Sequence, residues 1–195
     1  MNPVHHFRHC PACGAERSAD ATAGVSPLQC RGCGFTFHFN AAISAAVFLW
    51  REDGRVLMIR RAKDPGRGML GPPGGFVDVG ERVEVAVRRE VREEVGLEMT
   101  DVAFLGSFPN EYLYRGVTYP VLDLFFSARA VRPETAQALD DVDGLVWVEP
   151  FEELDPDQLA FPSVRRALEV LRRRPSGAGF LESTSPNVPP GAERE

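Results

Sequence analysis

The segment 75–97 constrains the fold more than any other part of the chain, because it combines a valine repeat with a cluster of carboxylates. The valines recur every four residues, at Val83, Val87, Val91 and Val95. At about 100° per residue, this spacing places the four side chains in one stripe on a helix. We therefore predict an amphipathic helix whose valine stripe faces a core.

Three glutamates follow helical spacing beside that stripe. Glu90, Glu93 and Glu94 stand at positions i, i+3 and i+4, so their carboxylates cluster on one face. Carboxylates one turn apart repel each other, whereas Mg2+ or Mn2+ prefers oxygen ligands and keeps waters that phosphate oxygens replace. The spacing therefore predicts a divalent-metal site. A solvated acidic face is the alternative, but it leaves Arg89 and the neighbouring glycines unexplained.

Written as a pattern, the segment is G-x5-E-x7-R-E-U-x-E-E-x-G-U, where U is a bulky apolar residue. Gly75 opens the pattern and Leu97 closes it. The chain resembles the Nudix hydrolases, whose signature it matches at every fixed position. The resemblance implies an α/β fold, the Nudix α/β/α sandwich with a mixed sheet. It also implies a Mg2+- or Mn2+-dependent enzyme that splits the diphosphate bond of a nucleoside diphosphate linked to another group.

The same resemblance implies catalytic roles for the charged residues of the segment. Metal contact falls first to Glu90 and Glu94 and next to Glu93. Arg89 pairs with glutamates of the signature and orients them. Glu81 supports the metal site, and it lies at the expected helix start, where the helix dipole favours negative charge.

The general base stays open. A carboxylate takes a proton from the water that attacks phosphorus, and family members use either a glutamate of the signature or a carboxylate from a later loop. Glu134, Asp140 and Asp141 lie in such a loop, before a strand-like segment around Trp147. The alternative is that they are ordinary acidic loop residues without a catalytic role. For each residue taken alone, we favour this alternative.

Four further residues are candidates for substrate binding. Gly74 and Gly75 follow two prolines, and paired glycines let a backbone pass close to a ligand, although a tight loop is the alternative. Arg61 ends a strand-like segment and opens a loop that we expect near the substrate. Tyr114 lies where some relatives stack an aromatic ring on adenine, but it also fits a half-buried hairpin strand with Gly116 in its turn.

The four cysteines form two pairs, Cys10-x2-Cys13 and Cys30-x2-Cys33. Two such pairs at this separation predict a Zn2+ site of the zinc-ribbon type, and four thiolates close the shell, so the metal is structural. The glycine after each pair permits the turn that aims backbone amides at sulfur. Two disulfides are the alternative, but they require export, and we see no signal-peptide pattern. We expect a cytoplasmic protein.

The charge balance bears on the partners. Lysine and arginine number 22 against 28 aspartate and glutamate, a net charge of −6, which is the opposite of a nucleic-acid-binding footprint. We therefore expect a small-molecule nucleotide substrate and no nucleic-acid partner, and no apolar span of membrane length is present. Phe35, Phe37 and Phe39 alternate, which suits base stacking or, as we favour, packing of the ribbon onto the catalytic domain.

The chain divides into three parts. We expect a zinc ribbon over 1–40, a Nudix domain over 41–174, and a disordered tail over 175–195 that is rich in Pro, Gly, Ser and Glu. Residues 162–174 read as an amphipathic closing helix. Its apolar and basic side chains are expected to face inward and outward respectively: Val164, Leu168 and Leu171 against Arg165, Arg166, Arg172, Arg173 and Arg174. Strands are predicted at 43–50, 56–59, 102–108 and 121–126 and around Trp147.

Ribbon plus Nudix domain is similar to the NADH pyrophosphatase branch of the family. That branch carries a Ser-Gln-Pro-Trp-type motif after the signature, where this chain has the segment 106–114 instead. The expected substrate is NADH, ADP-ribose or a dinucleoside polyphosphate. The alternatives are a nucleotide-sensing protein without turnover and an RNA 5′-pyrophosphohydrolase. Many Nudix enzymes dimerise, so a homodimer stays open.

Overall fold

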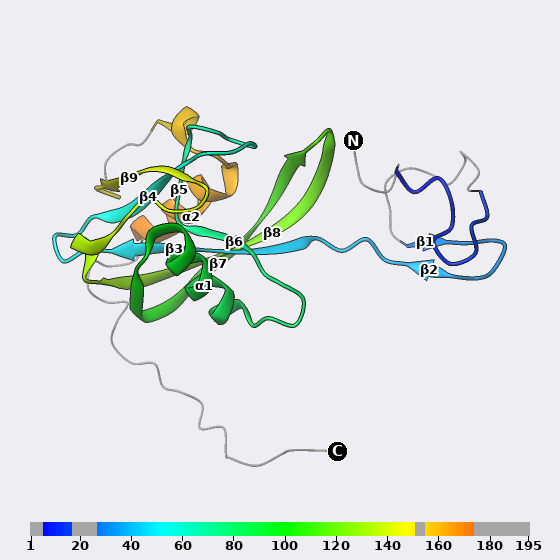
Figure 1. Ribbon diagram of the computed structural model, residues 1–195, viewed down its shortest axis with the longest axis horizontal. Helices are drawn as coiled ribbons and strands as arrows, with labels where there is room; N and C mark the ends of the chain where they lie inside the picture. The colour runs from blue at the N-terminus through cyan, green and yellow to red at the C-terminus, as the bar shows by residue number, and fades with distance from the viewer. Residues whose placement is uncertain (1–5, 17–26, 151–154, 174–195) are drawn as a thin grey trace, which may run out of the picture.

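The computed structural model describes residues 6–16, 27–150 and 155–173. These residues form a small N-terminal unit and a larger body in which helices pack on a sheet (Figure 1). The expected tail over 175–195 and Arg174 lie outside the described residues. Within the described part of the chain, no helix has both the length and the apolar character needed to cross a bilayer.

The sheet of the larger body is mixed. Strands follow one another in the order β5-β4-β3-β8-β7, with β6 paired to β3 and β9 paired to β4. Strands β3 and β8 run parallel and the other pairs are antiparallel. The strands span Ala42–Trp50 (β3), Val56–Arg61 (β4), Leu70–Gly71 (β5), Gly74–Phe76 (β6), Glu98–Tyr114 (β7), Val117–Val131 (β8) and Val142–Val148 (β9). The mixed α/β sheet predicted from the family resemblance is confirmed.

Two helices cover opposite faces of this sheet. Helix α1 (Val83–Val95) packs against Val47 and Leu49 of β3, whereas α2 (Pro162–Arg173) packs against Phe48 of the same strand. Successive strand residues point to opposite faces, so a strand covered on both faces is apolar throughout. Two short 3-10 helices, η2 (Pro133–Thr135) and η3 (Pro156–Gln158), lie in the connections.

Both helices present the apolar stripes expected of them. Val87, Val91 and Val95 of α1 are fully buried, and the helix ends at Gly96 with a φ of 68°. In α2, three side chains are buried as predicted: Val164, Leu168 and Leu171. The 3.6-residue repeat therefore predicted these faces correctly.

Two arginines of the helices are partly buried, and for one of them, Arg172, the sequence predicts a solvent-facing side chain. Arg88 donates from its guanidinium to the carbonyl of Met99 at 2.8 Å, and Arg172 donates to the carbonyl of Pro150 at 2.5 Å. The aliphatic stem of an arginine lies along apolar surface while its head reaches a polar partner, so a helix position alone does not fix exposure. Arg92 does face solvent, where it pairs with Glu98.

The β7–β8 hairpin is longer than the predicted strands at 102–108 and 121–126. Its pairing continues to Tyr114 opposite Val117, and the turn between them contains Gly116 at a φ of 80°, as predicted. The end of the hairpin extends away from the helices (Figure 1).

The N-terminal unit contains strands β1 (Leu28–Gln29) and β2 (Thr36–Phe37), which pair antiparallel. It lies apart from the larger body and is joined to it by an extended segment leading into β3 (Figure 1). The rings of Phe37 and Phe39 contact each other and Phe7, with centroids 4.9 to 5.8 Å apart. These two rings therefore pack within the ribbon, and the expectation that they dock it onto the catalytic domain is wrong.

Candidate active site and cysteine cluster

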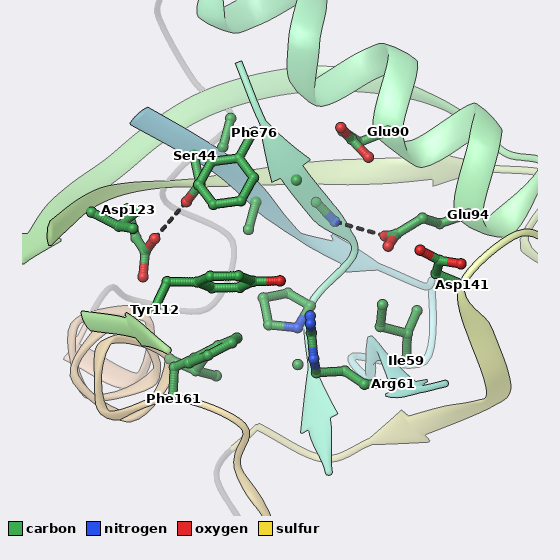
Figure 2. Close-up of a pocket in the computed structure, with 18 of the residues that line it drawn as sticks. Ser44, Ile59, Arg61, Phe76, Glu90, Glu94, Tyr112, Asp123, Asp141 and Phe161 are labelled. Atoms are coloured by element: carbon green, nitrogen blue, oxygen red, sulfur yellow. Dashed lines mark hydrogen bonds between the residues drawn. The ribbon is translucent and has the colours of Figure 1, made fainter. Parts of the chain in front are cut away.

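A pocket of about 410 Å3 opens in the larger body. It is lined by strands of the sheet, by one face of α1 and by the first turn of α2. Figure 2 shows Glu90, Glu94 and Asp141 at one end, and Asp123, Tyr112 and Phe161 at the other. The first end gathers the carboxylates of the sequence signature, and the second gathers aromatic rings.

Two of the three signature glutamates line the pocket. Glu94 is only 9% exposed, and its carboxylate accepts a hydrogen bond from the backbone N–H of Gly74 at 2.8 Å. Burial raises the pKa of Glu94 to about 8, and burial also raises the pKa of Glu90. The side chain of Glu93 is half exposed, at 49%, and is not among the lining residues. The helix spacing thus brings Glu90 and Glu94 into the pocket and leaves Glu93 at its rim.

Arg89 connects the carboxylates. Its Nη1 donates to Glu90 at 2.7 Å and to Glu93 at 3.0 Å. Its Nε and Nη2 donate to the two carboxylate oxygens of Glu81 at 3.1 and 3.0 Å, and Nη2 also reaches the carbonyl of Phe76. These hydrogen bonds lower the pKa of Glu81. The guanidinium therefore fixes the carboxylates in a set arrangement, although it does not itself line the pocket.

Gly74 and Gly75 both line the pocket, in strand β6. A Cβ atom on Gly75 would come within 2.4 Å of Oε1 of Glu90, and one on Gly74 within 2.3 Å of the carbonyl oxygen of Ala45. Glycine at position 74 therefore lets β6 approach the backbone of β3, and glycine at position 75 leaves room for the carboxylate of Glu90.

The carboxylate end fits a hard divalent cation. Glu94 is buried with one backbone donor, and a charge held out of water requires a compensating partner. Glu90 lies one turn before it and lines the same pocket. Two carboxylates on one wall, with Glu93 at the rim, are the oxygen donors that Mg2+ or Mn2+ takes.

A second group of charged residues faces the signature glutamates. Arg61, Lys63, Asp140 and Asp141 all line the pocket, and Lys63 forms an ion pair with Asp141. Glu134 lies in η2 and is not a lining residue. The sequence alone favours ordinary loop acidity for each of these three acids, but the fold brings two of them, Asp140 and Asp141, to the pocket.

The aromatic end holds two residues that the sequence pattern did not single out, Asp123 and Phe161. Tyr112 lies at the same end, and Tyr114 and Asn110 are also among the residues that line the pocket. Asp123 interrupts the apolar run 121–126, and a single carboxylate in a strand buried on both faces is the signal that marks it.

The cysteines form a separate cluster. All four Sγ atoms lie within 4.8 Å of one another, with Cys10 and Cys33 at 3.8 Å and Cys13 and Cys30 at 3.7 Å. These separations are too long for disulfide bonds, and they match the edge of a tetrahedron with metal–sulfur bonds of about 2.3 Å. The cluster therefore fits one tetrahedral metal ion.

The two halves of the cluster have the same local structure. In each, the N–H of the glycine after the pair donates to the carbonyl of the first cysteine at 2.9 Å, and both glycines, Gly14 and Gly34, have positive φ. The backbone N–H groups of Cys33 and Gly32 lower the pKa of the Cys30 thiol to about 6, whereas the neighbouring cysteine sulfurs raise the pKa of the Cys33 thiol to about 12.

Residues 41–171 match the family model described as NUDIX domain. The chain belongs to the NUDIX family. A solved MutT NUDIX hydrolase from Burkholderia pseudomallei is 26% identical, with a TM-score of 0.56 over 68% of this chain and 98% of that one.

Two curated relatives extend the comparison beyond the NUDIX fold. The NAD-capped RNA hydrolase NudC of Pseudomonas aeruginosa is 30% identical over 90% of this chain, and the chain spans 59% of that relative's length. The ADP-ribose pyrophosphatase of Methanocaldococcus jannaschii is 44% identical over 29% of this chain and 34% of its own length.

Proposed function

We propose that this NUDIX protein is a Mg2+- or Mn2+-dependent pyrophosphohydrolase that hydrolyses the diphosphate bond of a nucleoside diphosphate linked to another group. The observation that carries the proposal is the pair of pocket-lining carboxylates, Glu90 and the buried Glu94. The names of the relatives support NAD- or ADP-ribose-type substrates. When bound, the cation neutralises diphosphate charge and lowers the pKa of water.

The residues of the chain divide the remaining tasks. Glu90 and Glu94, with Glu93 at the rim, hold the cation, and Arg89 with Glu81 keeps the carboxylates in place. Arg61 and Lys63 bring positive charge to the same pocket, where the diphosphate lies.

Proton transfer from water falls to a pocket carboxylate. Glu94 and the Asp140–Asp141 pair both qualify by position, since all three line the pocket. Asp140→Asn and Asp141→Asn, each measured beside Glu94→Gln, separate them, because loss of a base that does not hold the cation lowers kcat without weakening metal binding, whereas Glu94→Gln weakens metal binding as well.

The cysteine cluster, Cys10, Cys13, Cys30 and Cys33, is assigned a structural Zn2+ ion within a ribbon over 1–40, followed by the NUDIX domain from residue 41. Four thiolates leave no open position for a substrate, so this metal supports folding rather than the reaction.

The test is a turnover panel with zinc-loaded protein and Mg2+. It contains NADH, NAD+, ADP-ribose, diadenosine polyphosphates and nucleoside triphosphates, with Glu94→Gln as the matched inactive variant. We expect strong turnover of a NAD- or ADP-ribose-type compound that Glu94→Gln lacks. If the wild type binds a compound of the panel tightly but does not turn it over, the protein is a nucleotide sensor and not an enzyme.

NAD-capped RNA is the second candidate substrate, because the name of the Pseudomonas aeruginosa relative specifies it. The net charge of −6 favours the free nucleotide. A capped oligonucleotide in the same panel decides between them: a kcat/KM for RNA that exceeds that for NAD+ and falls steeply with salt would favour the capped RNA.

A further inference from the structure

Asp123 is a charged residue to which the proposed reaction gives no task. It lies on β8 within an apolar run, is 6% exposed, and lines the pocket. Figure 2 places it at the end opposite Glu94. An ionisable side chain is rarely buried unless it is paired, so its hydrogen bonds indicate what it does.

Two serine hydroxyls hold the Asp123 carboxylate. Ser44, directly opposite on the parallel strand β3, donates to Oδ1 at 2.5 Å, and Ser163 at the start of α2 donates to Oδ2 at 2.5 Å. Each serine uses its only hydrogen for this purpose. The carboxylate is therefore fixed as an acceptor.

The carboxylate keeps capacity for further hydrogen bonds. Its two oxygens offer about four acceptor positions, of which the serines occupy two. Because Asp123 lines the pocket, the remaining capacity is available to a ligand there. A ligand group with N–H bonds is attracted, and a phosphate or carboxylate is repelled.

Aromatic rings surround the same end of the pocket. Tyr112 and Phe161 have ring centroids 6.0 Å apart, and the rings of Phe76 and Tyr112 form an edge-to-face pair with centroids 5.3 Å apart. The guanidinium of Arg61 lies 5.1 Å from the centre of the Phe161 ring. Flat apolar surfaces beside a fixed acceptor suit a planar heterocycle with an amino group at its edge.

We propose that Asp123 is a specificity residue that accepts a hydrogen bond from the amino group of a planar nitrogen heterocycle in the substrate. This inference rests on the proposed function, since it specifies one end of a dinucleotide-type substrate. Two parts of NAD+ carry such a group, the 6-amino group of adenine and the carboxamide of nicotinamide.

Binding measurements test the proposal independently of turnover. Titration calorimetry without Mg2+ compares NAD+ with nicotinamide hypoxanthine dinucleotide, which lacks the adenine amino group, and with nicotinic acid adenine dinucleotide, which lacks the amide N–H. We expect one of these analogues to bind about 10- to 100-fold more weakly than NAD+, the range for a hydrogen bond to a charged group. The weakened analogue identifies which end of the substrate Asp123 contacts.

Asp123→Asn keeps the shape of the side chain and replaces one acceptor oxygen with a donor. We expect the preference for NAD+ over the weakened analogue to shrink by about 10-fold or more. Ser163→Ala is the matched control, because Ser163 is fully buried, does not line the pocket and removes only one hydrogen bond to Asp123. It should lower Tm and keep the preference.

Equal binding of NAD+ and both analogues by the wild type overturns the inference, as does a preference that Asp123→Asn leaves intact. Absence of binding for all three also overturns it. If Asp123→Asn does not fold, the wild-type comparison decides alone. If the protein prefers NAD+ over one analogue but turns over no compound of the panel, the role of Asp123 in binding stands and the proposed hydrolase activity is wrong.

Discussion

At the scale of single residues, two adjacent glycines are required for different reasons. Gly74 has a φ of 154°, and a Cβ there meets backbone atoms of Ala45 and Ala46 at 2.3 and 2.5 Å. The nearest atoms to a Cβ on Gly75 are those of the Glu90 carboxylate. A backbone cannot yield cheaply, whereas a side chain can move, so the same substitution should have opposite consequences at the two positions.

Gly74→Ala should therefore cost stability, on the order of 2–4 kcal/mol, because strand β6 has to separate from β3. Gly75→Ala should leave the free energy of unfolding within about 1 kcal/mol and reduce kcat/KM about 100-fold, because the Glu90 carboxylate is displaced. Denaturant unfolding and steady-state rates on both variants check this. A Gly75→Ala protein with normal kcat/KM would contradict the place of Glu90 in the site.

The burial of Glu94 predicts a pH dependence of stability. Its pKa of about 8 in the folded protein without Mg2+ exceeds the ordinary value of 4.5, so the folded state favours the neutral carboxyl. This contribution to stability is full below about pH 4.5 and is lost as the pH rises to about 8. Glu90, whose pKa is also raised, acts in the same direction.

We expect Tm without Mg2+ to be higher at pH 5 than at pH 8, and Mg2+ to raise Tm most at pH 8, where the carboxylates bind it. Glu94→Gln should flatten both trends. Calorimetric scans across this range, with zinc retained, provide the measurement. A wild type whose Tm rises with pH in the absence of Mg2+ would show that other groups dominate.

At the scale of elements, the periodic segments were predicted well and their ends were not. The helix at 83–95 follows from the valine repeat and the glycine that ends it. The hairpin strands β7 and β8 run past the predicted ends because their pairing continues through polar and aromatic residues to the turn at Gly116. Backbone hydrogen bonds to a neighbouring strand, which hydrophobic patterns do not encode, decide where these strands stop.

Helix α2 lines part of the pocket and also packs in the core. Leu168 is 2% exposed and belongs to the same apolar cluster as Phe125, which lines the pocket. Leu168→Ala should therefore reduce the free energy of unfolding by about 2–4 kcal/mol through the cavity it leaves. Arg165→Ala, on the exposed face of the helix, should change it by less than about 0.5 kcal/mol. Urea unfolding of the pair provides the comparison, and equal losses would contradict the packing.

At the scale of the whole molecule, the cysteine unit and the larger body are separate in space (Figure 1). Among its described residues, 6–16 and 27–40, the unit has two short strands and a small aromatic cluster of its own. So little apolar burial does not stabilise a fold without metal. The sheet and its helices, in contrast, have two extensive cores.

Zinc removal should accordingly unfold the N-terminal unit and leave the melting of the NUDIX domain within a few degrees of its original Tm. Cys30→Ser should have the same effect. Circular dichroism, metal analysis and calorimetry on the zinc-free protein, measured with Mg2+ restored, test this. A large fall in the Tm of the main transition would show that the ribbon supports the NUDIX domain directly.

The sequence by itself determined the features that depend on local spacing. The carboxylates of α1, the glycines of β6 and the two cysteine pairs are each close in the chain, so helix or turn geometry fixes how they face one another. The tertiary structure decided what meets across the pocket. Asp123, Phe161 and Asp140 come from β8, the residue before α2 and a loop before β9, and their proximity depends on strand order and helix packing. Because these contacts join segments far apart in sequence, no local pattern predicts them.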